Sequence, residues 1–373
     1  LYLHPKSQRV LFNTLGKIAE SHQVVVTTHS PLFFAPGVTA TFVRVSKRAA
    51  TPKPIGVLNP VNFALDARSA EVFRLARFEN CDAAFFSGRV VLFEGESDDA
   101  YIRHVSKLLN PDWDFELKNV ALVRVSGKGN FAKFRDFFSA FGIEVKIVAD
   151  LDALFDGFQH LGAGVAAVDA RQLALREIDA CIARREIVAQ PNARQIRRRV
   201  GQDSFKGRYD TAKAALRAVR AGEPVDANTV AALDGLFDWE QDLTRELACR
   251  NDPAAAIALV PLLDALRRDG VCVLSRGAIE EYYPEGVPAG GAKPDRALQA
   301  AALLTTADEA LALSSPLAHG RAAELRCVRV GVRRVRVAGQ RHQVRGDRRR
   351  AVPMHAARGA EVRQPGLAGR CRG

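Results

Sequence analysis

Three short apolar runs, each ending in a polar turn, constrain the fold of this 373-residue chain more than any other feature. They are Val90–Phe93, Val120–Val125 and Val145–Ala149. Continuous apolar runs of this length are typical of strands buried on both faces. Helical spacings fill the gaps between them, at Asp98–Leu109 and Phe131–Phe141. Strand, helix, strand, helix, strand predicts an α/β fold with a parallel sheet covered by helices on both faces.

The strand pattern then breaks and later returns. Residues 153–268 are rich in Ala, Arg and Leu and read as mostly helical, whereas Val271–Leu274 is again a short apolar run. A helical segment, Pro294–Leu313, follows. We therefore expect residues 153–268 to be a large helical insertion between two strands of one sheet.

The residues before the sheet are less regular. A one-faced apolar spacing predicts a helix over residues 6–20, and the β-branched run Gln23–Thr28 predicts a buried strand. Residues 36–62 contain Pro and Gly that indicate short strands and turns. Residues 69–87 suit a connecting helix and loop.

The net charge of +12 lies entirely in the C-terminal tail. Residues 321–373 hold 15 Arg, no Lys and three acids, whereas the remainder has 39 basic and 39 acidic residues. We expect no fold in the tail, residues 317–373. It is either a disordered basic arm that binds phosphates or the product of a frameshifted GC-rich gene.

Other classes of protein are disfavoured. No run of about 18 apolar residues exists, so no membrane span is expected, and no signal peptide is visible. We expect a cytoplasmic protein. None of the six cysteines forms a CxxC pair, which argues against a zinc site. The chain begins at Leu1, and we expect it to be truncated at its N-terminus.

Acidic residues follow the strands in a repeated way. Glu94 ends the first strand, Asp150 and Asp152 follow the third, Glu280 lies just after the fourth, and Asp98 comes one helical turn after Glu94. The C-terminal ends of parallel strands share one edge of the sheet, where ligand sites form. Carboxylates crowded there would repel one another unless cations bound them, and oxygen ligands suit Mg²⁺ or Mn²⁺. Two such ions would suit the hydrolysis of a phosphodiester.

Each acid also has a simpler interpretation. An Asp or Glu after a strand is often a helix cap, and Asp98 would be favoured by the helix dipole. A separate cap would have to be invoked for every acid, so the metal site explains the set better. The Gly127–Asn130 loop would either contact a phosphate through its backbone amides or form a plain tight turn.

These residues resemble a known family. Val91–Asp98 is similar to the opening Glu-Gly strand of Toprim domains, Val148–Asp152 to their Asp-x-Asp strand, and Ser275–Pro284 to the late acidic segment of OLD-family endonucleases. The helical insertion is also found in that family. The resemblance implies a Toprim fold over residues 88–316 and a nuclease that hydrolyses DNA with water as the nucleophile.

The resemblance also implies roles for individual residues. Two metal ions would be bound by five acids, Glu94, Asp98, Asp150, Asp152 and Glu280. Catalysis would rest on Glu94, Asp150, Asp152 and Lys293, with Lys293 neutralising the phosphate in the transition state. The alternative is that Lys293 is an ordinary surface lysine.

Residues 1–68 resemble the end of the ABC-type ATPase domain that OLD-family proteins carry. Leu1–Pro5 is similar to the segment after the Walker B acid, and Val24–Pro31 to the switch-histidine strand. His29 would then contact the γ-phosphate of ATP, although a buried core histidine is the alternative. The Walker A loop, the signature motif and the Walker B acids are missing, so this chain alone should not bind or hydrolyse ATP. Family members dimerise through the ATPase side, which makes a homodimer an expectation for the full protein.

Three other functions remain open from the sequence. One is a primase-like Toprim nucleotidyl transferase, for which no nucleotide-binding feature is visible. Another is a non-catalytic fragment of a DNA-repair or defence ATPase, in which this domain only binds DNA. The last is a non-functional product of a truncated, frameshifted gene.

Overall fold

The computed structural model describes residues 3–30, 33, 41–48, 53–62, 81–95 and 97–315. All of them belong to one structural unit, Leu1–Gly331. The Arg-rich tail expected over residues 317–373 lies outside the described residues, as does most of the expected connection over 69–87. Among the described helices, none combines the length and the apolar character needed to cross a membrane.

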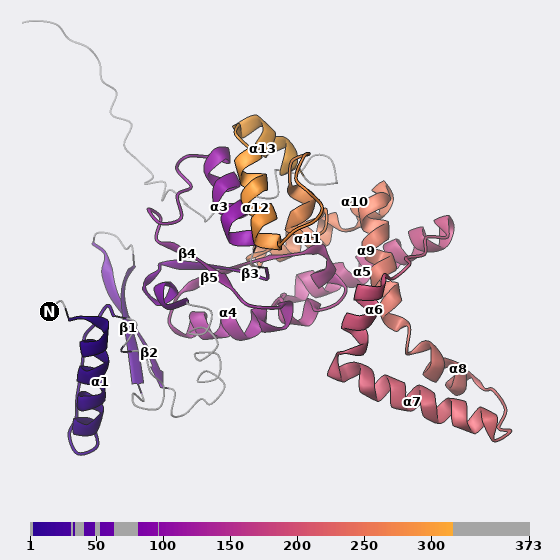
Figure 1. Cartoon of the computed structure of the whole chain (residues 1–373), viewed down its shortest axis with the longest axis horizontal. Helices are drawn as coiled ribbons and strands as arrows, with labels where there is room; N and C mark the ends of the chain where they lie inside the picture. Colours follow the sequence, from indigo (N-terminus) through magenta and orange to yellow (C-terminus); the bar gives the residue numbers. More distant parts are fainter. Residues whose placement is uncertain are drawn as a thin grey trace, which may run out of the picture. The chain divides into compact units, whose positions relative to one another are not determined.

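The central feature is a four-stranded parallel sheet (Figure 1). Its strands lie in the order β4-β3-β5-β6. Their bounds are β3 (Arg89–Phe93), β4 (Val120–Arg124), β5 (Glu144–Ala149) and β6 (Val271–Val273). The predicted strands and their parallel pairing are confirmed.

Side chains alternate between the two faces of the sheet, and both faces are buried. In β3, Val90 and Leu92 join one hydrophobic core and Val91 joins the other. Figure 1 shows α4 on one face, and α3, α12 and α13 together on the other. These helices are α3 (Asp98–Leu109), α4 (Phe131–Ala140), α12 (Lys293–Leu303) and α13 (Ala307–Leu313). The prediction of a sheet covered on both faces is therefore correct.

Aromatic rings dominate the core beneath α4. Phe134, Phe137 and Phe138 lie three or four residues apart, which places them on one face of the helix, and all are buried. Phe85 contacts Phe137 and Phe138, with ring centroids 5.7 Å apart in each pair. Burial of each phenyl ring contributes about 1.5–3 kcal/mol, which makes α4 a principal source of stability.

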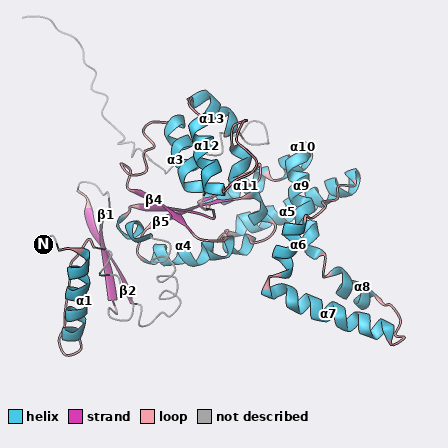
Figure 2. Cartoon of the chain, viewed as in Figure 1, coloured by secondary structure: helices cyan, strands magenta, loops and turns pink. Residues whose placement is uncertain are grey.

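The segment between β5 and β6 contains helices and no strand, as Figure 2 shows. Its helices are α5 (Val165–Arg185), α6 (Ala193–Val200), α7 (Asp203–Arg220), α8 (Ala227–Asp234), α9 (Asp238–Asn251), α10 (Pro253–Ala258) and α11 (Val260–Arg268). Ile178 of α5 and Leu266 of α11 are fully buried in the same core as Val90. The helical insertion predicted over 153–268 is thus present and is anchored to the sheet.

The N-terminal residues confirm one expectation and contradict another. Helix α1 (Pro5–Ala19) is present as predicted. Gln23–Thr28 is not a strand, and the side chains of Val25 and Val26 are 83% and 46% exposed. Neither sheet of the described residues includes this segment. Without a neighbouring strand its backbone groups remain hydrated, so the β-branched residues alone do not make a strand.

β1 (Thr41–Arg48) and β2 (Ile55–Asn62) pair in antiparallel fashion as a two-stranded sheet. Arg44 donates hydrogen bonds to the carbonyl oxygens of Ser87 at 2.8 Å and Phe85 at 3.2 Å. Val61 is buried in the core beneath α4. This two-stranded sheet is therefore tied to the parallel-sheet region by Arg44 and Val61, and Phe42 also packs against the same core.

Candidate metal centre

The acids converge because of the order in which the strands lie. β3 and β5 are neighbours, although β4 comes between them in the chain. The chain leaves β3 into α3, on one face, and leaves β5 towards α5, on the other. Segments that diverge to opposite faces open a crevice at the C-terminal ends of the two strands. Glu94 and Asp150 are the first residues after these strands and therefore lie at this crevice.

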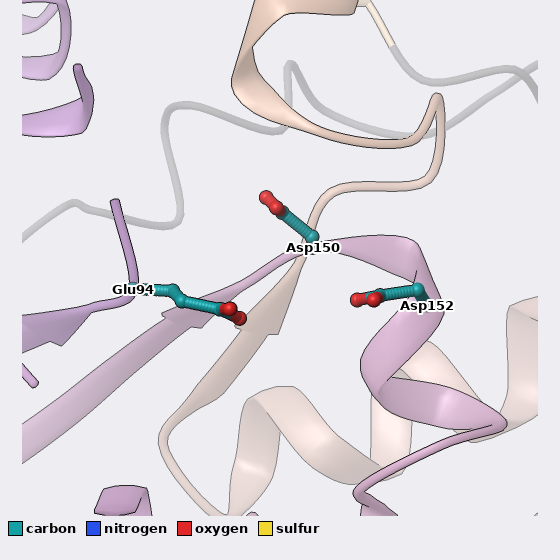
Figure 3. Close-up of side chains that lie close together, drawn as sticks. All are labelled: Glu94, Asp150 and Asp152. Atoms are coloured by element: carbon teal, nitrogen blue, oxygen red, sulfur yellow. The ribbon is translucent and has the colours of Figure 1, made fainter. Parts of the chain in front are cut away.

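Three of the predicted ligands come together there. Carboxylate oxygens of Glu94, Asp150 and Asp152 lie within 4.8 Å of one another. Figure 3 shows Glu94 and Asp150 at the ends of adjacent strands and Asp152 on the 3₁₀ turn after β5, with the side chains of Glu94 and Asp152 pointing toward one another. Oxygen atoms at this separation can bind one cation together. We call these three residues the acidic triad.

The remaining acids act on the triad electrostatically. Burial raises the pKa of Asp150 well above its ordinary value, and Asp98 and Asp152 raise it further. Glu94 and Glu280 have the same effect on the pKa of Asp150. The other four acids that the sequence singled out therefore lie around Asp150, although only Glu94 and Asp152 join it in the triad.

Asp98 is held by its own loop. Its carboxylate accepts hydrogen bonds from the Gly95 amide at 3.0 Å and the Ser97 hydroxyl at 3.2 Å. A Cβ atom at Gly95 would lie only 3.1 Å from the Asp98 carboxylate, so the glycine permits this approach. Burial raises the pKa of Asp98 to about 6, despite these hydrogen bonds.

The capping interpretation fails where the structure tests it. Asp150 precedes the short 3₁₀ turn Leu151–Leu154, but its side chain makes no capping hydrogen bond. Ala278, rather than Glu280, is the cap of the turn Ile279–Tyr282. These acids are therefore not explained by the ends of helices.

Lys293 lies at the same edge of the sheet. It begins α12, and its Nζ is 2.6 Å from Oε1 of Glu280. It also lowers the pKa of Glu94 and of Asp98, although burial keeps both pKa values raised overall. The lysine therefore belongs to the acidic site rather than to an unrelated surface.

A second lysine was missed as a site residue. Lys128 follows β4, and its Nζ lies 2.8 Å from Asp152 and 3.3 Å from Asp156. A Cβ atom at Gly157, which has a φ of +120°, would lie 2.9 Å from the Lys128 side chain. The sequence drew attention to the Gly127–Asn130 loop for its backbone amides, whereas the side chain of Lys128 reaches the site.

The residues fit a divalent cation. Oδ1 of Asp152 is buried and has no hydrogen-bond partner among the described residues, while Oδ2 pairs with Lys128. A buried polar atom without a partner is unfavourable unless something binds it. The triad offers only carboxylate oxygens, the ligands that Mg²⁺ and Mn²⁺ prefer.

The insertion also contributes charges that the sequence did not reveal. Arg198 of α6 lowers the pKa of Glu94. Glu246 of α9 is partly buried, and its pKa is raised by burial and by Asp152. Both helices therefore lie near enough to influence the triad.

His29, expected at an ATP γ-phosphate, does not belong to this site. Its side chain is exposed, and its ring centroid lies 5.9 Å from that of Phe86. It is therefore neither a metal ligand nor the buried core histidine considered above.

Comparisons with known proteins agree with this geometry. Residues 85–152 match the family described as "Overcoming lysogenization defect protein-like, TOPRIM domain". Over 156 residues, 41% of this chain, the sequence is 26% identical to the Old nuclease of Escherichia phage P2. The match covers 26% of that relative, so the chain spans about a quarter of its length. The family match begins just before β3 and ends at Asp152, and it therefore contains the whole acidic triad. The segment that carries the acidic triad is therefore similar to the Toprim domain of OLD-family proteins.

Proposed function

We propose that the Toprim domain of this chain hydrolyses phosphodiester bonds of DNA with the help of divalent metal ions. The observation that carries the proposal is the acidic triad, in which three carboxylates approach within 4.8 Å around the buried end of β5. The likeness to a nuclease supports the choice of reaction.

The chain's own residues have distinct roles in this proposal. The acidic triad would hold one Mg²⁺ or Mn²⁺ ion, and Asp98 and Glu280, beside Asp150, would help to hold a second. Such ions, when bound, activate a water nucleophile and stabilise the leaving oxygen. The protein's part is to keep the five carboxylates at one edge of the sheet, ionised and oriented.

The two lysines would compensate the charge of different acids, Lys128 that of Asp152 and Lys293 that of Glu280. Lys128 is 12% exposed and pairs with Asp152, so it fixes the orientation of a ligand. Lys293 is 57% exposed and reaches the site beside Glu280, so it is accessible to a DNA phosphate. We therefore assign the stabilisation of the phosphate in the transition state to Lys293.

The wider protein context is also part of the proposal. Residues 1–68 would be the end of an ABC-type ATPase domain, whose ATP hydrolysis is coupled to cleavage and whose surface forms a homodimer. This chain contains no GxxxxGK[ST] loop, so no step here involves ATP. We place the protein in the cytoplasm, where DNA is accessible.

Plasmid nicking tests the proposal. Purified chain is incubated with supercoiled plasmid in Mg²⁺, Mn²⁺ or EDTA, beside Asp150→Ala and, as a matched control, Asp234→Asn at an exposed residue of α8. We expect nicking that needs metal and Asp150 and is unaffected by the control. Full activity of Asp150→Ala would overturn the site. DNA binding without cleavage in every condition would favour the non-catalytic alternative.

A further inference from the structure

A cavity of about 150 Å³ adjoins the acidic triad. Its walls come from three places: the end of the parallel sheet, helix α6 and helix α9. The lining residues are Lys128, Asp152, Phe155, Asp156, Gln195, Arg198, Arg199, Gln202, Trp239, Asp242, Leu243 and Glu246. Asp152 belongs to both the cavity and the triad, so the two adjoin at this residue.

Helix α6 forms a wall of polar and basic side chains. Gln195, Arg198, Arg199 and Gln202 are spaced at three, four and seven residues, which places them on one side of α6 and the turn that follows it. Arg198 is exposed. Nε of Arg199 is buried and has no hydrogen-bond partner among the described residues. Nη1 of Arg199 donates to Oε1 of Gln202 at 2.9 Å. The wall therefore offers the guanidinium group of Arg198 and Nε of Arg199 to an anion.

Helix α9 forms the facing wall with a different chemistry. Trp239, Asp242, Leu243 and Glu246 repeat the same spacing and lie on one face of α9. An indole ring and a leucine offer a flat apolar surface, and the two acids offer hydrogen-bond acceptors. Acids would repel a phosphate, so an anion suits the α6 wall and an uncharged ring suits the α9 wall.

We propose that this cavity receives one unstacked base of a DNA strand, while a phosphate next to that base lies at the acidic triad. The base stacks on Trp239, and the phosphate that follows it contacts Arg198 and Arg199. This inference rests on the proposed nuclease function and adds the form of DNA that the enzyme takes.

The size of the cavity favours a single base. Pockets for drug-sized ligands measure about 300–1,000 Å³, whereas an engineered apolar cavity of about 150 Å³ in another protein takes one benzene ring. The volume of this cavity equals that of the engineered cavity that takes one ring. It is too small for a whole nucleotide, so the sugar and phosphate remain at its mouth, where Arg198 is exposed.

The stacking of bases within a duplex determines which form of DNA can place a base in this cavity. A base within a duplex lies between its neighbours and must be unstacked before it can enter a pocket. Single-stranded or locally melted DNA needs no such step, and aromatic side chains bind its bases with little regard to sequence. The enzyme therefore takes single-stranded or unpaired DNA in preference to an intact duplex.

Fluorescence tests the pocket without relying on cleavage. The chain has two tryptophans, Trp113 and Trp239, so Trp113→Phe leaves Trp239 as its only indole. This variant is titrated in Mg²⁺ with an uncleavable phosphorothioate oligothymidylate of about eight nucleotides. The same titration is made with the matching duplex and with an abasic strand of equal length. We expect the oligothymidylate to quench the fluorescence, the duplex to quench it less, and the abasic strand not to quench it.

Affinities of the substituted proteins give a second measurement. Trp239→Ala should bind the oligothymidylate about 5- to 150-fold more weakly, the usual effect of losing one stacked base. Trp239→Phe should retain most of the affinity, and both variants should bind the abasic strand as the parent does. Circular dichroism and thermal melts confirm that each variant is folded.

Failure of the pocket can be told apart from failure of the nuclease. Equal affinity of Trp239→Ala for the oligothymidylate, or absence of quenching in the Trp113→Phe protein, overturns the pocket even where plasmid nicking needs Asp150. Quenching that is lost with the abasic strand supports the pocket even where no nicking is detected.

Discussion

At Asp150, the cluster of carboxylates that would bind a metal ion is unfavourable for the stability of the metal-free protein. The residue is held among four other carboxylates, and burial together with these neighbours raises its pKa. In the metal-free protein the same arrangement that would bind a cation is electrostatically unfavourable. Perturbed acids of this kind are typical of functional sites.

Asp98 makes the stability of the metal-free protein depend on pH. Its pKa is about 6 in the folded chain, against 3.8 for an ordinary aspartate. The folded state therefore binds its proton more tightly than the unfolded state, so this group lowers stability as the pH rises from about 4 to about 6. In EDTA, the melting temperature of Asp98→Asn should fall less over this range than that of the parent. Parallel pH profiles of the two proteins would contradict the assignment.

Lys128 should matter most when no metal is bound. Lys128→Met removes the partner of Asp152 and leaves a partly buried carboxylate without compensation, which should cost about 1.5–3 kcal/mol in EDTA. A bound cation supplies the missing charge, so the loss should be smaller in Mg²⁺. Denaturant unfolding in the two conditions measures the difference. Lys118→Met, at an exposed lysine, is the matched control.

At the scale of elements, the sequence predicted correctly those strands whose formation depends on the local pattern of apolar residues. Val90–Phe93 is apolar throughout and Val145–Ala149 is apolar except for Lys146, because both faces of the sheet are covered, and each run lies within one residue of the observed strand. Gln23–Thr28 has a similar composition but, among the residues that the structure describes, no neighbouring strand. A strand is stabilised by its partners, and a single run of residues does not reveal whether they exist.

The lysine and the cavity could not be predicted because they depend on distant packing. Lys128 meets Asp152 because β4 and β5 lie on either side of β3, and no local pattern encodes that order. Arg198 and Trp239 face one cavity although 40 positions separate them in the chain. The α6 arginines were visible only as a charged stretch, which ordinarily describes a solvated helix face.

Helix α4 should be the element on which the sheet most depends. Phe138 is fully buried and contacts the rings of Phe85 and Phe137. Phe138→Ala would leave a cavity and should lower the free energy of unfolding by about 3–5 kcal/mol. Leu117→Ala, at a side chain that is 84% exposed, should change it by less than about 0.5 kcal/mol. Similar values for the two variants would show that α4 is not packed as described.

At the scale of the whole molecule, metal binding should stabilise the fold. A ligand that binds only the folded state adds about 2.7 kcal/mol when its concentration is 100 times its Kd. Saturating Mg²⁺ or Mn²⁺ should therefore raise the melting temperature by roughly 4 °C above that in EDTA. Asp150→Asn should lose most of this shift, whereas Asp234→Asn should retain it. An equal shift in both variants would place the binding elsewhere.

The position of the insertion has a consequence for how the chain folds. β3, β4 and β5 lie close together in sequence, whereas about 120 residues separate β5 from β6, its neighbour in the sheet. Contacts between distant segments form late because closing a long loop costs entropy. Pulsed hydrogen exchange during refolding should therefore protect the amides of β3 and β5 before those of β6. Glu94, Asp150 and Asp152 would then be in place first, and Glu280 would complete the site only as the last strand joins the sheet.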